Sequence, residues 1–199
     1  MPAGKALFLV VLTGLCAVLG ACGRPPAPSA GIVPGGPGLS KDDVDRQDAA
    51  SRWANDYCVA VGSLVDELAT MPSVDPSSPQ RAVRTSSDLL ASMISGLDKA
   101  VQGLHNLPPS PVAGGDKVRG DAVSQFTVVR EHAAEAKKRL DKARDATQID
   151  QQTLGAARDP LNEVSKIDLL NGFTTVPELL TASEHAPVCE QLLTREPPP

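Results

Sequence analysis

The side chains with the most distinctive chemistry in this chain of 199 residues are its cysteines and histidines. A cysteine thiol can be acylated, oxidised to a disulfide or bound to a metal, and its spacing from other cysteines helps to decide among these uses. The cysteines are Cys16, Cys22, Cys58 and Cys189, and no two of them form a C-x-x-C pair. We therefore expect covalent anchoring or cross-linking rather than a redox centre.

Cys22 ends a segment that is typical of a secretory signal. Met1 to Lys5 is short and weakly positive, and the apolar run from Ala6 to Leu19 is too short to span a bilayer comfortably. The tetrapeptide Leu19-Gly20-Ala21-Cys22 resembles the lipobox of bacterial lipoproteins. This resemblance implies that residues 1–21 are removed and that Cys22 carries a diacylglycerol thioether. Several acyl chains, such as palmitate, would then anchor the chain durably to a membrane.

Two alternatives for this segment stay open. An ordinary signal peptide cut near Ala21 would leave Cys22 as a free thiol. Cys16 is a rival acylation site, but Thr13-Gly14-Leu15 before it fits the lipobox poorly. Cys22 is the predicted lipidation site.

Composition divides the rest of the chain. Five prolines and five glycines lie between Gly23 and Leu39, and such a segment lacks the apolar residues needed for a core. We expect residues 22–39 to form the lipidated cysteine and a flexible Pro/Gly-rich tether, residues 40–195 a helical bundle domain, and residues 196–199 a disordered tail.

From Ser40 onward, apolar residues recur with the 3.6-residue period of a helix. Ser40 with Asp43, and Ser78 with Pro79, predict helix starts, and a start of the first helix nearer Asp45 is the alternative. Asp116 is expected to cap a third helix. A fourth helix should begin around Asp150 and kink or divide at Pro160, before a short segment from 177 to 193. The predicted fold is all-α, an antiparallel four-helix bundle with a kinked or divided last helix.

Cys58 and Cys189 remain once Cys16 is removed and Cys22 is acylated. In an exported domain, two such cysteines are expected to pair. The bridge would tie the C-terminal segment to the first helix. The alternative, a reactive thiol pair, would need an electropositive setting, and none is visible in the sequence.

Short motifs around these two cysteines resemble a known group. Trp53-Ala54-Asn55-Asp56-Tyr57-Cys58, Pro108-Pro109 between helices, and Ala186-Pro187-Val188-Cys189 are similar to small secreted helical lipoproteins of actinobacteria, of the mycobacterial type. Members of that group are generally uncharacterised. The resemblance therefore implies a location and a disulfide-tied helical fold, and it transfers no functional residues.

Other motifs favour structure over chemistry. His105, His132 and His185 have no spacing typical of a metal site, and no nucleophile or phosphate-binding motif is present. We expect no catalytic, cofactor-binding or metal-binding residues. Arg119-Gly120-Asp121 spells an adhesion tripeptide but should lie in a helix. The basic residues from Lys137 to Arg144 alternate with acids, which predicts a solvated face.

Trp53 and Tyr57 are close in sequence and admit two interpretations. They could form a platform for a ligand, or they could pack around a bridge between Cys58 and Cys189. We favour the second interpretation.

Overall composition narrows the function classes. The formal net charge of −5 argues against binding to nucleic acid, and the 3% of aromatic residues disfavours a sugar-binding cleft. We expect a non-enzymatic lipoprotein on the extracytoplasmic face of the cell membrane that binds an unidentified envelope protein or component. The alternative is a carrier or sensor of a small apolar ligand held between helices. No oligomeric state is predicted.

Overall fold

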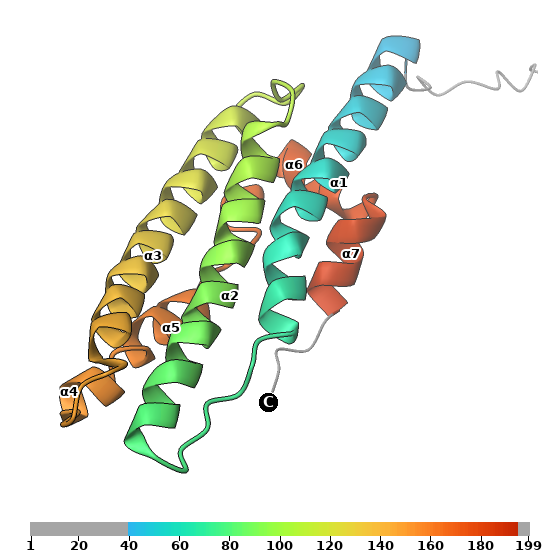
Figure 1. Ribbon diagram of the computed structural model, residues 1–199. Helices are drawn as coiled ribbons and strands as arrows, with labels where there is room; N and C mark the ends of the chain where they lie inside the picture. The colour runs from blue at the N-terminus through green and yellow to red at the C-terminus, as the bar shows by residue number, and fades with distance from the viewer. Residues whose placement is uncertain (1–39, 195–199) are drawn as a thin grey trace, which may run out of the picture. The chain divides into compact units, whose positions relative to one another are not determined.

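The computed structural model describes residues 40–194 of the chain. These residues form seven α-helices and one 3-10 helix, and no strand occurs among them (Figure 1). The predicted all-helical class is therefore confirmed for the described residues. None of their helices is long and apolar enough to cross a membrane.

Three long helices make up most of this fold, namely α1 (Lys41–Ala69), α2 (Pro79–His105) and α3 (Gly115–Ala143). The Ser40 hydroxyl accepts a hydrogen bond from the amide of Asp43, and the Ser78 hydroxyl accepts one from Arg81, so both predicted caps form. α3 starts differently from the prediction. Its cap is Gly114, with φ of 89°, and Asp116 lies in its first turn and accepts a hydrogen bond from the amide of Ser110.

The long helices pack through α2, which contacts both α1 and α3. The chain reverses direction at each connection, so neighbouring long helices are antiparallel (Figure 1). Their shared core is made mainly of fully buried leucines with one methionine and one phenylalanine: Leu64, Leu90, Met93, Leu97, Leu104, Phe126 and Leu140. Burial of these apolar stripes is the main source of stability for the helices.

The last third of the described chain is broken into short elements: α4 (Gln151–Leu154), α5 (Arg158–Val164), the 3-10 helix η1 (Phe173–Thr175), α6 (Pro177–Glu184) and α7 (Pro187–Thr194). Gly155 ends α4, and Gly172 takes φ of 94° before η1. Pro177 and Pro187 then start new helices because proline lacks an amide hydrogen.

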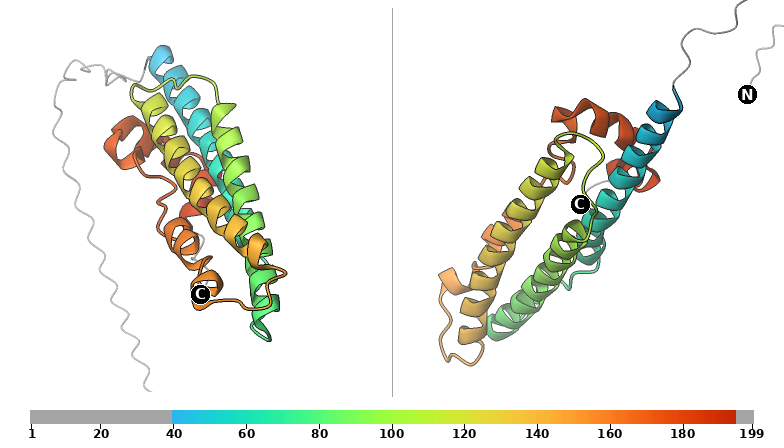
Figure 2. Two further views of the ribbon diagram at one scale, coloured as in Figure 1. Left: turned by 60° about the vertical axis from the view of Figure 1, so that its left-hand side comes forward. Right: turned by 90° about the horizontal axis from the view of Figure 1, so that it is seen from above.

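These short elements pack on the long helices, α5 on α3 and both α6 and α7 on α1. The views of Figure 2 show them along one face of the three long helices. The last helix is divided as predicted, but its first break lies between α4 and α5, and Pro160 is within the first turn of α5. A four-helix-bundle arrangement is not confirmed. One long fourth helix is replaced by these pieces.

Small residues set how closely α1 and α2 approach. A Cβ added at Gly103 would lie 2.8 Å from the Cβ of Ala60, and one added at Gly96 would lie 2.9 Å from the Cβ of Glu67. Both separations are shorter than van der Waals contact. The two helices therefore lie too close together for any side chain at these two positions.

Replacing Gly103 by alanine should destabilise the fold. The added methyl group must push α1 and α2 apart, which costs about 1–3 kcal/mol, although alanine regains up to about 1 kcal/mol of helix propensity. Gly120→Ala is the matched control, because no atom lies within 4 Å of a Cβ built there. Urea unfolding followed by the fluorescence of Trp53 should place Gly103→Ala below wild type and Gly120→Ala at or above it. Equal shifts for both variants would contradict this packing.

Candidate functional site

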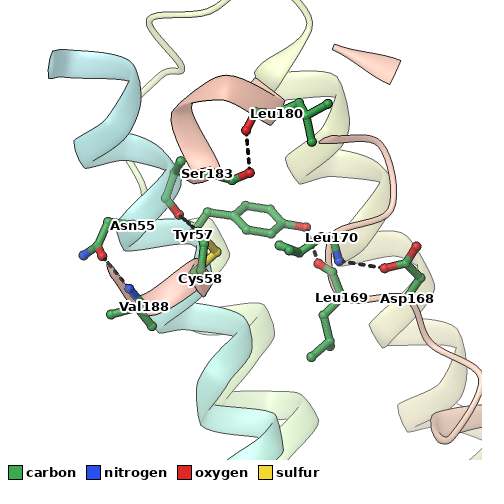
Figure 3. Close-up of a disulfide and its surroundings, with 11 residues drawn as sticks. Asn55, Tyr57, Cys58, Asp168, Leu169, Leu170, Leu180, Ser183 and Val188 are labelled. Carbon is green, nitrogen blue, oxygen red and sulfur yellow. Dashed lines mark hydrogen bonds between the residues drawn. A yellow bond between two sulfur atoms is a disulfide. The ribbon is translucent and has the colours of Figure 1, made fainter. Parts of the chain in front are cut away.

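A disulfide joins α1 to α7 across 131 residues of sequence. The Sγ atoms of Cys58 and Cys189 are 2.01 Å apart, their Cα atoms are 5.1 Å apart, and both residues are fully buried (Figure 3). The predicted pairing is confirmed. Because both cysteines are oxidised and inaccessible, they serve as a cross-link and do not form a reactive thiol site.

The turn of α1 before Cys58 contacts three further segments. The indole N–H of Trp53 donates to the carbonyl oxygen of Pro108 at 3.0 Å, in the connection between α2 and α3. The side-chain oxygen of Asn55 accepts from the backbone N–H of Val188 at 3.1 Å, in the first turn of α7. The Tyr57 hydroxyl donates to the carbonyl oxygen of Leu169 at 3.4 Å, in the connection between α5 and η1 (Figure 3).

Aromatic packing completes this region. The ring of Tyr57 lies 4.9 Å from that of Phe173 in η1 and 5.8 Å from that of Trp53, measured between centroids. All three rings are buried. We call Trp53, Asn55, Tyr57, Cys58, Phe173 and Cys189 the cysteine cluster. Trp53 and Tyr57 thus pack beside the disulfide, as the favoured interpretation expected, and offer no open face to a ligand.

Two members of the cysteine cluster, Asn55 and Phe173, have roles that the sequence did not indicate. Ala186 precedes α7 and has no side-chain acceptor for the free amides of its first turn, so Asn55 supplies one from a distant helix. Such a long-range cap leaves no local pattern to recognise.

The histidines do not assemble a metal site. His132 Nδ1 lies 2.7 Å from Glu163 Oε2, which links α3 to α5 at the surface. His105 is in the last turn of α2, and His185 follows the end of α6. Within residues 40–194, no group of three or more histidine, cysteine or acidic side chains is arranged to hold a metal ion.

The adhesion tripeptide lies within α3, as expected. Arg119 donates to the carbonyl oxygen of Leu107 at 2.8 Å and pairs with Asp116 at 2.9 Å. Asp121 pairs with Lys117, one turn earlier. Two of the three residues are thus engaged within the fold, in a helix rather than at a loop tip.

An apolar cleft lies between α1, α6 and the connection from α2 to α3. Its volume is about 490 Å³, and its lining includes Ala50, Val112, Pro177 and Ala182, with Arg46 and Glu178 among its charged residues. It is open to solvent. Its floor forms where α6 packs against α1.

A second surface hollow lies between the end of α3 and the helices α4 and α5. It consists of two adjoining depressions of about 350 and 520 Å³ that share Arg139, Gln152 and Ala156. Lys142 lines the first depression, and Arg158 and Asp159 line the second. We call these two depressions together the basic groove.

Cys22, the predicted lipidation site, lies outside the described residues, as do the signal segment 1–21 and the tether. The lipid anchor therefore stays a prediction from the sequence. The described chain begins with Ser40, which caps α1.

Burial of Tyr57 gives the fold a dependence on alkaline pH. Burial raises the pKa of Tyr57 above its ordinary value of 10.0, and the negative charge of Asp168 raises it further. The folded state thus holds the phenolic proton more tightly than the unfolded state. This contribution to stability is complete below pH 10 and is lost as the pH rises toward the folded pKa.

The free energy of unfolding should therefore fall by about 1.4 kcal/mol for each pH unit above 10, because of the Tyr57 phenol. Tyr57 is the single tyrosine, so tyrosinate absorbance reports on it alone. We expect absorbance and Trp53 fluorescence to change together as the fold opens, and Tyr57→Phe to weaken the pH dependence. Tyrosinate that forms near pH 10 while the fold stays intact would contradict the buried hydroxyl.

Comparisons with known proteins give no relative for this chain. No protein-family model, no curated protein and no solved structure matches it. The candidate sites above accordingly rest on the geometry of the chain itself.

Proposed function

We propose that this chain is a lipoprotein of the cell envelope. It is acylated on Cys22, held on the extracytoplasmic face of the cell membrane, and has a non-enzymatic role in which its helical domain binds another protein or an envelope component. The actinobacterial resemblance of its cysteine motifs fits the same location.

The observation that carries this proposal is the disulfide between Cys58 and Cys189. Disulfides form and persist mainly in exported proteins, because the cytosol keeps thiols reduced. Export agrees with the apolar segment before Cys22, and the lipobox adds the means of retention. The cross-link and the signal segment are independent features of the sequence, and both favour an extracytoplasmic location.

A binding role is favoured because the distinctive polar side chains of the described domain hold its helices together. Asn55 caps α7, Trp53 bonds to the connection after α2, and His132 pairs with α5. The candidate binding sites of the described domain are two hollows on its surface, the apolar cleft and the basic groove.

A second candidate function is favoured by the apolar cleft. Its volume of about 490 Å³ is in the range of small-molecule pockets, which supports a carrier or sensor of a small apolar ligand. Ala133 and Ala136 are fully buried and do not line the cleft, so they serve close helix packing.

The anchor is tested by two matched substitutions in the native host. Cys22→Ser should leave the chain without acyl mass and release it from the membrane fraction, while Cys16→Ser should stay acylated and membrane-bound. Intact mass spectrometry and membrane fractionation measure both. Retention of Cys22→Ser in the membrane, or loss of acylation in Cys16→Ser, would contradict acylation at Cys22.

The binding role is tested in the same strains by crosslinking in living cells. We expect a specific protein or envelope component to be captured by the anchored chain and to be lost with Cys22→Ser. Native mass spectrometry of the extracted chain separates the two candidates, because a small companion that leaves on denaturation would support the carrier. No specific neighbour in crosslinking would contradict the leading proposal.

A further inference from the structure

The basic groove contains cations that the fold leaves unused. Within residues 40–194, Arg139 and Lys142 on α3 and Arg158 on α5 have no ion pair or hydrogen bond from their side chains. Arg130 and Lys137 of α3 are engaged, since Arg130 pairs with Asp98 and Lys137 pairs with Asp141, whereas Lys138 near the same end of the helix is also unpaired. The unpaired charges therefore gather at one end of α3.

Asp141, which lies between Arg139 and Lys142 in the sequence, is engaged with other side chains. Asp141 lies 2.6 Å from Lys137 Nζ and accepts a hydrogen bond of 2.6 Å from the Ser87 hydroxyl on α2. The hydrogen bond from Lys137 and then that from Ser87 lower the pKa of Asp141, so its negative charge is held in the contact between α2 and α3. The sequence predicted a solvated face of alternating charges, and the fold instead draws Asp141 away from Arg139 and Lys142.

One carboxylate, Asp159 in the first turn of α5, does line the groove. The lining also contains the three cations Arg139, Lys142 and Arg158, so its formal net charge is +2. Gln151 and Gln152 add amide donors. The hollow of about 520 Å³ is larger than a single oxyanion needs.

From this geometry we infer that the basic groove binds a multivalent oxyanion, a ligand that carries two or more phosphate or carboxylate groups. The guanidinium groups of Arg139 and Arg158 match such groups with paired hydrogen bonds, and Lys142 adds a point charge. The cations come from two different helices. A ligand with several charged groups can contact all of them, whereas a ligand with one charged group cannot.

The groove and the start of α1 lie at opposite ends of the long helices. Trp53 of α1 bonds to the connection after α2, so the start of α1 shares an end of the fold with that connection. The groove is lined by residues at the end of α3 and in α4 and α5. Figure 1 shows α4 and the end of α3 at the end of the long helices opposite the connection after α2. A helix of 29 residues such as α3 is about 44 Å long, which sets the scale of that separation.

This inference deepens the proposed function by naming the class of envelope component, and it rests on that proposal only for where the ligand is met. Binding in solution does not depend on acylation or on a partner protein. If the groove binds no oxyanion, the test of acylation at Cys22 is unaffected. If Cys22 is not acylated, ligand binding at the groove can still be tested.

The test is calorimetric titration of the full chain in non-ionic detergent at low salt. The probes are tripolyphosphate, which carries several charges, and glycerophosphoglycerol, the singly charged headgroup of a common anionic lipid. We expect tripolyphosphate to bind at least tenfold more tightly than glycerophosphoglycerol, with an affinity that falls as salt is added.

Variants decide whether the groove is responsible. Arg139→Gln/Arg158→Gln should weaken tripolyphosphate binding at least tenfold. Arg52→Gln/Lys117→Gln removes the same charge from exposed positions outside the groove and should stay within twofold of wild type. Thermal unfolding verifies that both variants fold.

Three results would overturn the inference. They are no binding of tripolyphosphate by the wild-type chain, equal weakening by both double variants, and a preference for glycerophosphoglycerol. The last result would assign the charge to a lipid headgroup rather than to a multivalent ligand.

Discussion

The cross-link between Cys58 and Cys189 is the constraint on which the arrangement of the C-terminal third depends. The elements α4 to α7 have between three and eight residues, and helices this short are not stable alone in water. Among them, η1, α6 and α7 hold their positions because α1 provides a covalent bond, a cap from Asn55 and a buried aromatic neighbour in Tyr57, whereas α4 and α5 pack on α2 and α3. On the chain-entropy model, closing a loop of 131 residues stabilises the fold by about 5 kcal/mol. That amount is comparable with the net stability of many domains.

Both candidate binding surfaces exist because short helices lie on long ones. The apolar cleft forms where α6 meets α1, close to the cysteine cluster, so its shape depends on the cross-link. The basic groove forms where α4 and α5 meet the end of α3, and there the contact between His132 and Glu163 and the burial of Val164 provide the attachment. The two surfaces are thus held by different contacts, and a change at one of them need not disturb the other.

The long helices and the disulfide could be predicted because their causes are local or compositional. Apolar stripes and the serine caps at Ser40 and Ser78 define helices without any knowledge of their neighbours, and an exported chain with two remaining cysteines has one pairing. The basic groove could not be predicted in this way. Its charge depends on Asp141 turning toward Ser87 and on Arg158 lying across from Arg139, and both are consequences of packing between helices. The further breaks in the last helix likewise depend on the left-handed conformation of Gly172.

The most direct test of this account is amide hydrogen exchange of the full chain, compared with Cys58→Ala/Cys189→Ala. If the cross-link holds the C-terminal third on α1, amides of α6 and α7 should exchange at least a hundredfold faster in the variant, a factor that corresponds to about 2.7 kcal/mol. The slowest amides of α2 and α3, which pack through their own leucine core, should change by less than about tenfold on the same reasoning. Unchanged protection in α7, or the same loss of protection in every helix, would contradict the central role of the cross-link.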